Sequence, residues 1–254
     1  MRWKQAGASV TGKAHSSRGE SGQDFSKAGS VQIADTHFFI GLAADGAGST
    51  TDGGRGAEIA CTTLWEQITA FVRDEPDISK ITDNIVKDWI TQARAAVDIE
   101  ADHNGKKPRD YATTILGAVA GPDLAVYFQI GDGAIVTGSG TMYDTVFWPE
   151  QGEYANTTFF LTDEKYQENL KIRFADAPDE IALFTDGLQT LVLSFATRTA
   201  HAGFFSPLFA ALRASPADGI GALSLQLAPF LLREDISARS DDDKTLVLAV
   251  RIAG

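Results

Sequence analysis

The stretch Phe38-Phe39-Ile40-Gly41-Leu42-Ala43-Ala44-Asp45-Gly46-Ala47-Gly48 passes without a break from an apolar run into an acidic, glycine-rich turn. A short apolar run that ends at such a turn is typical of a strand buried inside a sheet. Two other apolar runs end in the same way, at Gly131-Asp132-Gly133 and at Thr185-Asp186-Gly187. A single Asp-Gly pair usually marks a plain turn. Three of them at strand ends predict carboxylates that converge at one edge of a sheet.

A fourth acidic group, Asp241-Asp242-Asp243, precedes the last apolar run, at 246–252. Converging carboxylates repel one another and stay ionised together only around a cation. Their oxygens suit Mg²⁺ or Mn²⁺, and the chain has no cysteine cluster or histidine pair with zinc-site spacing. The glycine after each aspartate is expected to leave room for a metal, water or phosphate near the backbone. A pair of such metals suits phosphate ester hydrolysis, because it activates a bridging water and offsets phosphoryl charge.

Composition restricts the class of protein further. The chain has 254 residues, of which 44% are hydrophobic and 22% charged, as in a globular protein with a sizeable core. Its formal net charge of −12, without a basic stripe, disfavours a nucleic-acid partner. The first residues lack an apolar signal core, and no apolar run approaches the roughly 20 residues that span a bilayer. With Cys61 as the single, buried cysteine, we expect a cytoplasmic protein without a disulfide or a membrane partner.

The apolar runs also predict the order of strands. A first β-hairpin joins residues 31–34 and 38–43, with its turn at Asp35-Thr36. A second hairpin joins residues 113–120 and 124–130. Further strands are expected at 134–136, 181–184 and 246–252.

Two amphipathic helices are predicted between the hairpins. Apolar residues recur at helical spacing from Ala60 to Phe71 and again from Ile81 to Val97. Asp77 or Ser79 is the expected N-cap of the second helix. Residues 204–233 are also expected to be helical, whereas the polar segment 138–180 is expected to form loops and a mobile flap.

Six short motifs carry a resemblance to a known family. The motifs are Gln23-Asp24, Ala44-Asp45-Gly46-Ala47-Gly48-Ser49, Ala112-Thr113-Thr114, Ile130-Gly131-Asp132-Gly133, Phe184-Thr185-Asp186-Gly187 and Asp242-Asp243-Lys244-Thr245. Each motif is weak alone, but their order resembles that of the metal-dependent protein serine/threonine phosphatases of type 2C, in their compact bacterial form. The resemblance extends from about Ser9 to Ile252, which is nearly the whole chain.

The resemblance implies an α+β fold, a four-layer α/β/β/α sandwich with two central antiparallel sheets. The chain would be a single catalytic domain, 1–254, with its core at about 9–252 and a variable flap at about 138–180. Two divalent metals, Mn²⁺ or Mg²⁺, would lie in a cleft at one end of the sandwich. The resemblance also implies the metal ligands. Asp45 would bridge both metals, the carbonyl of Gly46 would bind one metal, and Asp186 and Asp242 would bind the other metal. Asp24 would hold metal-bound water, and Asp132 would bind a third, weaker metal.

The chain departs from the family pattern at four places. Gln23 replaces a glutamate, and Asp243 replaces an asparagine, so Asp243 remains an alternative to Asp242 as the ligand. In many relatives an arginine holds the phosphate group. This chain has no arginine at the matching position, so Arg18 and His15 are the candidates for phosphate binding. Ala47 stands where some relatives carry a histidine that acts as the acid for the leaving group. We do not expect His15 to replace it efficiently.

The function that these residues imply is hydrolysis of phosphoserine and phosphothreonine in proteins. The substrate would be a phosphoprotein, the product of a serine/threonine kinase, and a monomer is the favoured state. One alternative is a non-catalytic relative that binds a phosphoprotein or a kinase. The retained acidic groups Asp45, Asp186 and Asp242 disfavour it, since an inactive copy has no reason to keep a costly carboxylate cluster.

Overall fold

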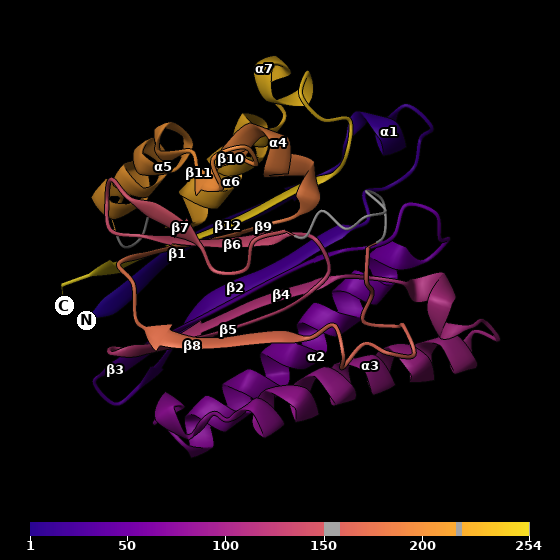
Figure 1. Ribbon diagram of the computed structural model, residues 1–254, viewed down its shortest axis with the longest axis horizontal. Coiled ribbons are helices and arrows are strands. Elements are labelled where there is room, and N and C mark those ends of the chain that lie inside the picture. The colour runs from indigo at the N-terminus through magenta and orange to yellow at the C-terminus, as the bar shows by residue number, and fades with distance from the viewer. Residues whose placement is uncertain (150–157, 217–219, 254) are drawn as a thin grey trace.

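Two five-stranded antiparallel sheets face each other at the centre of the protein (Figure 1). The computed structural model describes residues 1–149, 158–216 and 220–253. The first sheet contains, in spatial order, β1 (Arg2–Val10), β12 (Lys244–Ile252), β9 (Glu180–Phe184), β6 (Ala134–Gly138) and β7 (Tyr143–Thr145). The second contains β2 (Asp24–Ile33), β3 (Thr36–Asp45), β4 (Ile115–Ala120), β5 (Leu124–Ile130) and β8 (Lys171–Asp176).

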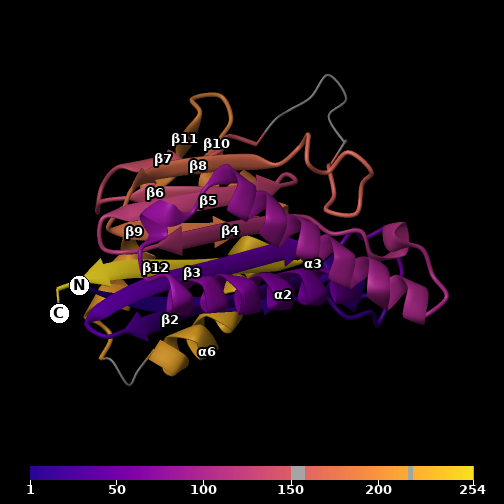
Figure 2. The ribbon, with the colours of Figure 1, turned by 90° about the horizontal axis from the view of Figure 1, so that it is seen from below.

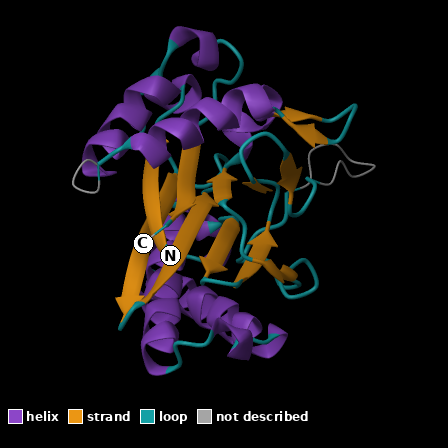
Figure 3. Ribbon diagram, turned by 90° about the vertical axis from the view of Figure 1, so that its left-hand side faces the viewer, coloured by secondary structure: helices purple, strands orange, loops and turns teal. Residues whose placement is uncertain are grey.

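Helices cover the outer face of each sheet, which completes the predicted four layers. The long helices α2 (Gly53–Asp74) and α3 (Asp83–His103) lie side by side over the second sheet (Figure 2). The helices α5 (Ala202–Ala214) and α6 (Ile220–Leu231) lie over the first sheet, as the end-on view shows (Figure 3). Short elements complete the chain: α1 (Lys13–Ser16), α4 (Gln189–Val192), α7 (Glu234–Ser237), the hairpin β10 (Leu193–Ser194) and β11 (Thr199–Ala200), and 3₁₀ turns at Ile78–Lys80, Pro108–Tyr111 and Asp186–Leu188.

Three apolar clusters hold these layers together. The cluster between the two sheets includes Phe39, Leu116 and Leu183, all without solvent exposure. A second cluster lies between α2, α3 and their sheet, and a third lies under α5 and α6. Because β3 packs against apolar side chains on both faces, its sequence is apolar from Phe38 to Ala44, as the strand pattern predicted. Cys61 is buried in the second cluster, also as predicted.

The first hairpin differs from its prediction by one residue. β2 and β3 pair from Asp24 with Asp45 to Ile33 with Thr36, so that the turn consists of Ala34 and Asp35. Ala34 adopts φ 51°, a left-handed conformation of the kind that tight hairpin turns require. Thr36 already belongs to the ladder.

The helices agree with the predicted stripes but not with the predicted cap. Thr82, not Asp77 or Ser79, is the N-cap of α3, and its hydroxyl accepts the amide hydrogen of Ile85 at 3.4 Å. Asp77 instead accepts the amide hydrogen of Ser79 in the short 3₁₀ turn that precedes it. The predicted helix at 204–233 divides into α5 and α6.

The segment 138–180 contains regular structure that the sequence analysis did not predict. β7 lies within it, and β8 forms an edge of the second sheet, so the expectation of loops is wrong at both places. Residues 150–157 of the predicted flap lie outside the described residues. β1 was also missed, although it pairs along its whole length with β12. Within the described ranges, no helix has both the length and the apolarity that crossing a bilayer requires.

Candidate metal centre

The Asp-Gly motifs meet at the end of the sandwich where α1 lies (Figure 1). Asp45 is the last residue of β3 and is paired across the ladder with Asp24, the first residue of β2. Asp186 comes from the loop after β9 of the opposite sheet, and its negative charge raises the pKa of Asp45. The negative charges of Asp24, Asp186, Asp242 and Asp132 all act on Asp45. The structure therefore brings all five predicted carboxylates together.

Burial and mutual repulsion both raise the pKa values of Asp24, Asp45 and Asp186. Burial is the larger cause, and it raises the pKa of Asp24 to about 7 and that of Asp186 to about 7. The pKa of Asp45 also lies well above its ordinary range, again through burial first and the neighbouring carboxylates second. A cation among these oxygens would favour the ionised forms. A set of donors made only of oxygen fits Mg²⁺ or Mn²⁺.

Threonines fix the positions of the two paired aspartates. The hydroxyl of Thr185 donates to Asp24 Oδ2 at 2.7 Å and accepts the amide hydrogen of Thr245 at 3.0 Å. The Asp45 amide donates to Thr114 Oγ1 at 2.9 Å, and the Thr113 hydroxyl donates to the Asp45 carbonyl at 3.1 Å. These threonines belong to the motifs quoted above, but the family resemblance implied no role for them.

Asp242 and Asp243 have different environments, although they are adjacent. Asp243 is only 2% exposed, and it accepts the amide hydrogens of Gly12 at 2.7 Å and Gln23 at 2.6 Å. The His15 Nδ1 atom lies 3.1 Å from its second oxygen. Asp242 is exposed, and its charge raises the pKa of Asp186 and of Asp45. These contacts favour Asp242 as the ligand and a supporting role for Asp243.

The carbonyl of Asp242 is held from the opposite side. The Lys244 Nζ atom donates to it at 2.6 Å, and the lysine side chain is buried to 2% exposure. His15, Asp242 and Asp243 each place one potential ligand atom within 4.8 Å of the others. The loop that carries Asp242 is therefore fixed between Lys244 and the α1 segment.

The two candidates for phosphate binding lie in unlike surroundings. Arg18 is exposed, forms an ion pair with Glu20 at 2.7 Å and lines a cavity of about 800 Å³ together with Gln23 and Gly48. His15 is 4% exposed and faces Asp243. The structure therefore places Arg18, and not His15, on the wall of the open cavity.

The glycines that follow the aspartates serve a different purpose from the predicted one. A Cβ at Gly46 would lie 2.1 Å from the backbone carbon of Gly53, at the start of α2. A Cβ at Gly187 would lie 1.9 Å from the carbonyl oxygen of Asp243. The space beside both glycines is filled by backbone, so the expectation that it is left open for a ligand is wrong there. These glycines allow separate loops to approach closely behind the carboxylates.

Asp132 has a partner that the sequence did not reveal. The hydroxyl of Thr158 donates to Asp132 Oδ2 at 2.6 Å, and the side-chain amide of Gln189 donates to the Asp132 carbonyl. Thr158 lies in a polar segment without periodicity, so no pattern in the sequence could have selected it.

The fold and the acidic centre together define a class of metal-dependent phosphatases. The family model described as "Protein phosphatase 2C" matches residues 11–231, and the chain belongs to this family. It is 32% identical, over 98% of its own length and 99% of the relative's, to serine/threonine-protein phosphatase 3 of Escherichia coli (strain K12).

Solved structures share the fold at much lower sequence identity. The serine/threonine phosphatase Stp1 from Staphylococcus aureus has a TM-score of 0.63 and 16% identity, with 98% of this chain and 95% of that chain covered. PppA of Pseudomonas aeruginosa, described as a regulatory component of T6SS, has a TM-score of 0.61 and 17% identity, with 99% and 98% covered. At these identities the likeness supports the fold alone.

The raised pKa values predict how the metal-free protein responds to pH. The pKa of Asp24 and that of Asp186 rise from 3.8 to about 7 on folding, so between these values the folded state binds more protons than the unfolded state. Stability must then fall as pH rises through this window. Thermal unfolding in excess chelator should show this decline, and Asp186→Asn should reduce it. A melting temperature that rises across the window would contradict the electrostatic account.

Proposed function

We propose that the protein hydrolyses phosphoserine and phosphothreonine in proteins with the aid of two divalent metals, Mn²⁺ or Mg²⁺. The observation that carries the proposal is the position of Asp45, which is paired with Asp24 of its own sheet and lies within the electrostatic reach of Asp186 from the other. Bound at such a centre, the metals supply a water nucleophile and neutralise phosphoryl charge. Membership of the protein phosphatase 2C family supports the same reaction.

Each carboxylate then has a separate role in this proposal. Asp45, the Gly46 carbonyl, Asp186 and Asp242 would hold the two metals, with Asp45 as the carboxylate common to both. Asp24, which is fixed by the Thr185 hydroxyl, orients metal-bound water. Asp132 is available to a third, weaker metal. To bind it, Asp132 would give up the hydrogen bond that it accepts from Thr158.

The substrate side of the centre is the polar cavity of about 800 Å³. Hydroxyl-bearing and glycine residues form much of its wall, which suits a peptide carrying a phosphate better than an apolar ligand. Arg18 lies at this wall, and we assign it the contact with phosphate. His15 supports the Asp242 loop through Asp243. A phosphoprotein made by a serine/threonine kinase is the substrate class, and the non-catalytic alternative is disfavoured because the carboxylates are complete.

A direct test is hydrolysis of phosphoserine and phosphothreonine peptides with added Mn²⁺ or Mg²⁺. Excess chelator should abolish turnover, and metal should restore it. Asp45→Asn should lower kcat/KM by more than about 100-fold, the upper end of the losses found for residues that merely support a metal ligand. Asp123→Asn, in the turn at the far end of β5, is the matched control and should retain activity. Full turnover in excess chelator would refute the proposal.

The assignment of Asp242 rather than Asp243 makes a second prediction. Asp242→Asn should weaken Mn²⁺ binding in calorimetry with little loss of stability, because its carboxylate is exposed. Asp243→Asn should instead lower the free energy of unfolding by about 1–3 kcal/mol, the cost of leaving a buried amide without its acceptor. Inactive Asp243→Asn beside normal Asp242→Asn would show that the ligand is Asp243.

The environment of Ala47 and His15 predicts how the rate depends on the leaving group. Ala47 cannot donate a proton, and His15 is buried against Asp243. A general acid typically contributes about 10²–10⁴-fold, mostly for poor leaving groups. Alkyl phosphates should therefore be cleaved much more slowly than aryl phosphates, and His15→Ala should leave this ratio unchanged. A native ratio near one that becomes large in His15→Ala would identify His15 as the acid.

A further inference from the structure

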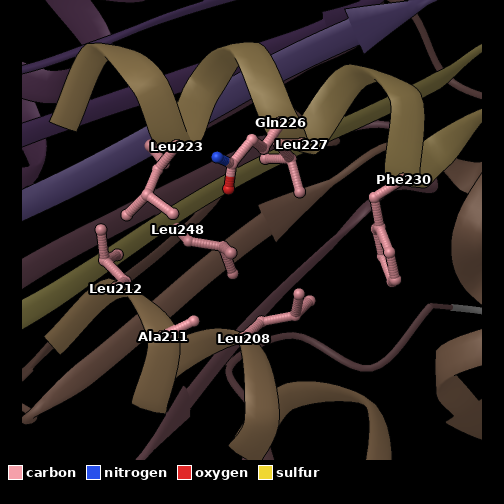
Figure 4. Close-up of a pocket in the computed structure, with 9 residues that line it drawn as sticks. Leu208, Ala211, Leu212, Leu223, Gln226, Leu227, Phe230 and Leu248 are labelled. Atoms are coloured by element: carbon pink, nitrogen blue, oxygen red, sulfur yellow. The ribbon is translucent and has the colours of Figure 1, made fainter. Parts of the chain in front are cut away.

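Two cavities of the protein differ in the chemistry of their walls. The pocket between α5 and α6 has a volume of about 210 Å³ and is lined by apolar side chains such as Leu208 and Leu227 (Figure 4). Among its described residues Gln226 is the single polar one, so this pocket offers no charged group to an ion or a phosphate. The cavity of about 800 Å³ beside the metal centre has a polar wall that includes another glutamine, Gln23, the neighbour of Asp24. The contacts of Gln23 therefore bear on the centre.

Gln23 is bonded to both backbone polar groups of Gly46, the residue whose carbonyl is an inferred metal ligand. The Gly46 amide donates to the Gln23 carbonyl at 3.1 Å. In return, the side-chain amide of Gln23 donates to the Gly46 carbonyl at 3.2 Å and to the Ala47 carbonyl at 2.9 Å. The network assigns this orientation of the amide, because the opposite one would set its oxygen against both carbonyls and gain only a long bond to the Thr50 carbonyl at 3.4 Å. The side chain therefore bridges the two residues that follow Asp45.

Glycines at the start of α2 leave the room that this side chain occupies. A Cβ at Gly53 would lie 2.5 Å from the side-chain amide of Gln23, and a Cβ at Gly54 would lie 3.0 Å from its Cα. The backbone of Gln23 is fixed as well, because its amide donates to Asp243 Oδ2 at 2.6 Å. Gln23 is therefore confined between α2 and Gly46, and its amide has little freedom to leave the carbonyl.

We propose that Gln23 is a positioning residue, which holds the Gly46 carbonyl in place before the metals bind. This role rests on the proposed function, because the Gly46 carbonyl is a ligand only if metals are bound at the centre. A carbonyl oxygen has two lone pairs, so Gly46 can accept from Gln23 and still offer one lone pair to a metal. Groups that hydrogen-bond to metal ligands fix the orientation of those ligands and strengthen metal binding.

A glutamate, which the family resemblance implies at position 23, could not hold the carbonyl in this way. An ionised carboxylate only accepts hydrogen bonds, so it would face two carbonyl oxygens without a donor between them. Gln23 also spares the centre one further negative charge where Asp24, Asp45 and Asp186 already repel one another. The glutamine thus replaces a charged contact by a fixed carbonyl.

The test is Mn²⁺ binding to the native chain and to Gln23→Met, measured by calorimetry. Methionine has a similar length but no N–H group. The variant should bind Mn²⁺ about 10–100-fold more weakly, the range found for partners of metal ligands. The Mn²⁺ concentration that gives half-maximal hydrolysis of an aryl phosphate should rise by the same factor.

The matched control is Gln32→Met, at the other end of the β2–β3 hairpin. The Gln32 side chain also donates to a carbonyl, that of Ala34 at 2.9 Å, so this variant loses a similar bond far from the centre. Its affinity for Mn²⁺ should equal that of the native chain. A further measurement needs no variant: in excess chelator, the side-chain amide hydrogens of Gln23 should exchange with solvent more slowly than those of the exposed Gln32.

The outcomes separate this inference from the proposed function. Equal Mn²⁺ affinity of the native chain and Gln23→Met would overturn the inference alone, and so would an equal loss of affinity in Gln32→Met. Rapid exchange of the Gln23 side-chain amide in the metal-free protein would overturn it as well. A native chain that neither binds Mn²⁺ nor hydrolyses phosphate esters would overturn the proposed function and, with it, the role of Gln23.

Discussion

The structure depends on holding carboxylates closer together than their charges favour. Asp24 faces Asp45 across one ladder, and Asp186 reaches Asp45 from the other sheet. The strands cannot relieve this repulsion by sliding, because both faces of β3 are closely packed, with Ile40 in one apolar cluster and Phe39 in another. Bound protons or bound cations must instead offset the repulsion. The raised pKa of Asp24 and that of Asp186 indicate that proton binding is favoured where no cation is bound.

Hydrogen bonds between the strands make this centre rigid. The Thr245 hydroxyl, on β12, donates to the Ser9 hydroxyl of β1. The Thr245 amide donates to the hydroxyl of Thr185, which follows β9. The Thr185 hydroxyl in turn donates to Asp24 of β2. One chain of contacts thus joins both sheets directly behind the carboxylates. A metal bound at the centre would gain from this order, because its ligands would not have to be immobilised on binding.

What the sequence could predict follows from where each strand lies. β3, β5 and β9 are interior strands, and their apolar runs located both the sheets and the aspartates at their ends. β1, β7 and β8 are edge strands, and all three were missed. An edge strand meets solvent along one side and carries polar residues that blur the pattern, as the exposed Arg173 of β8 does. The role of Gly46 could not be predicted either, because its close neighbour Gly53 approaches only in the folded chain.

The sequence favoured Asp242 as the ligand and left Asp243 as an alternative, because both lie in one loop. The contacts of Asp243 provide a physical distinction between the two. Its two oxygens accept from two different backbone amides, those of Gly12 and Gln23. An asparagine, which the family resemblance implies at this position, has one acceptor oxygen and would turn its amide group toward one of these donors. The carboxylate satisfies both, and it places a negative charge beside His15. Asp243 and His15 therefore act together, and their contact joins α1 to the loop that carries Asp242.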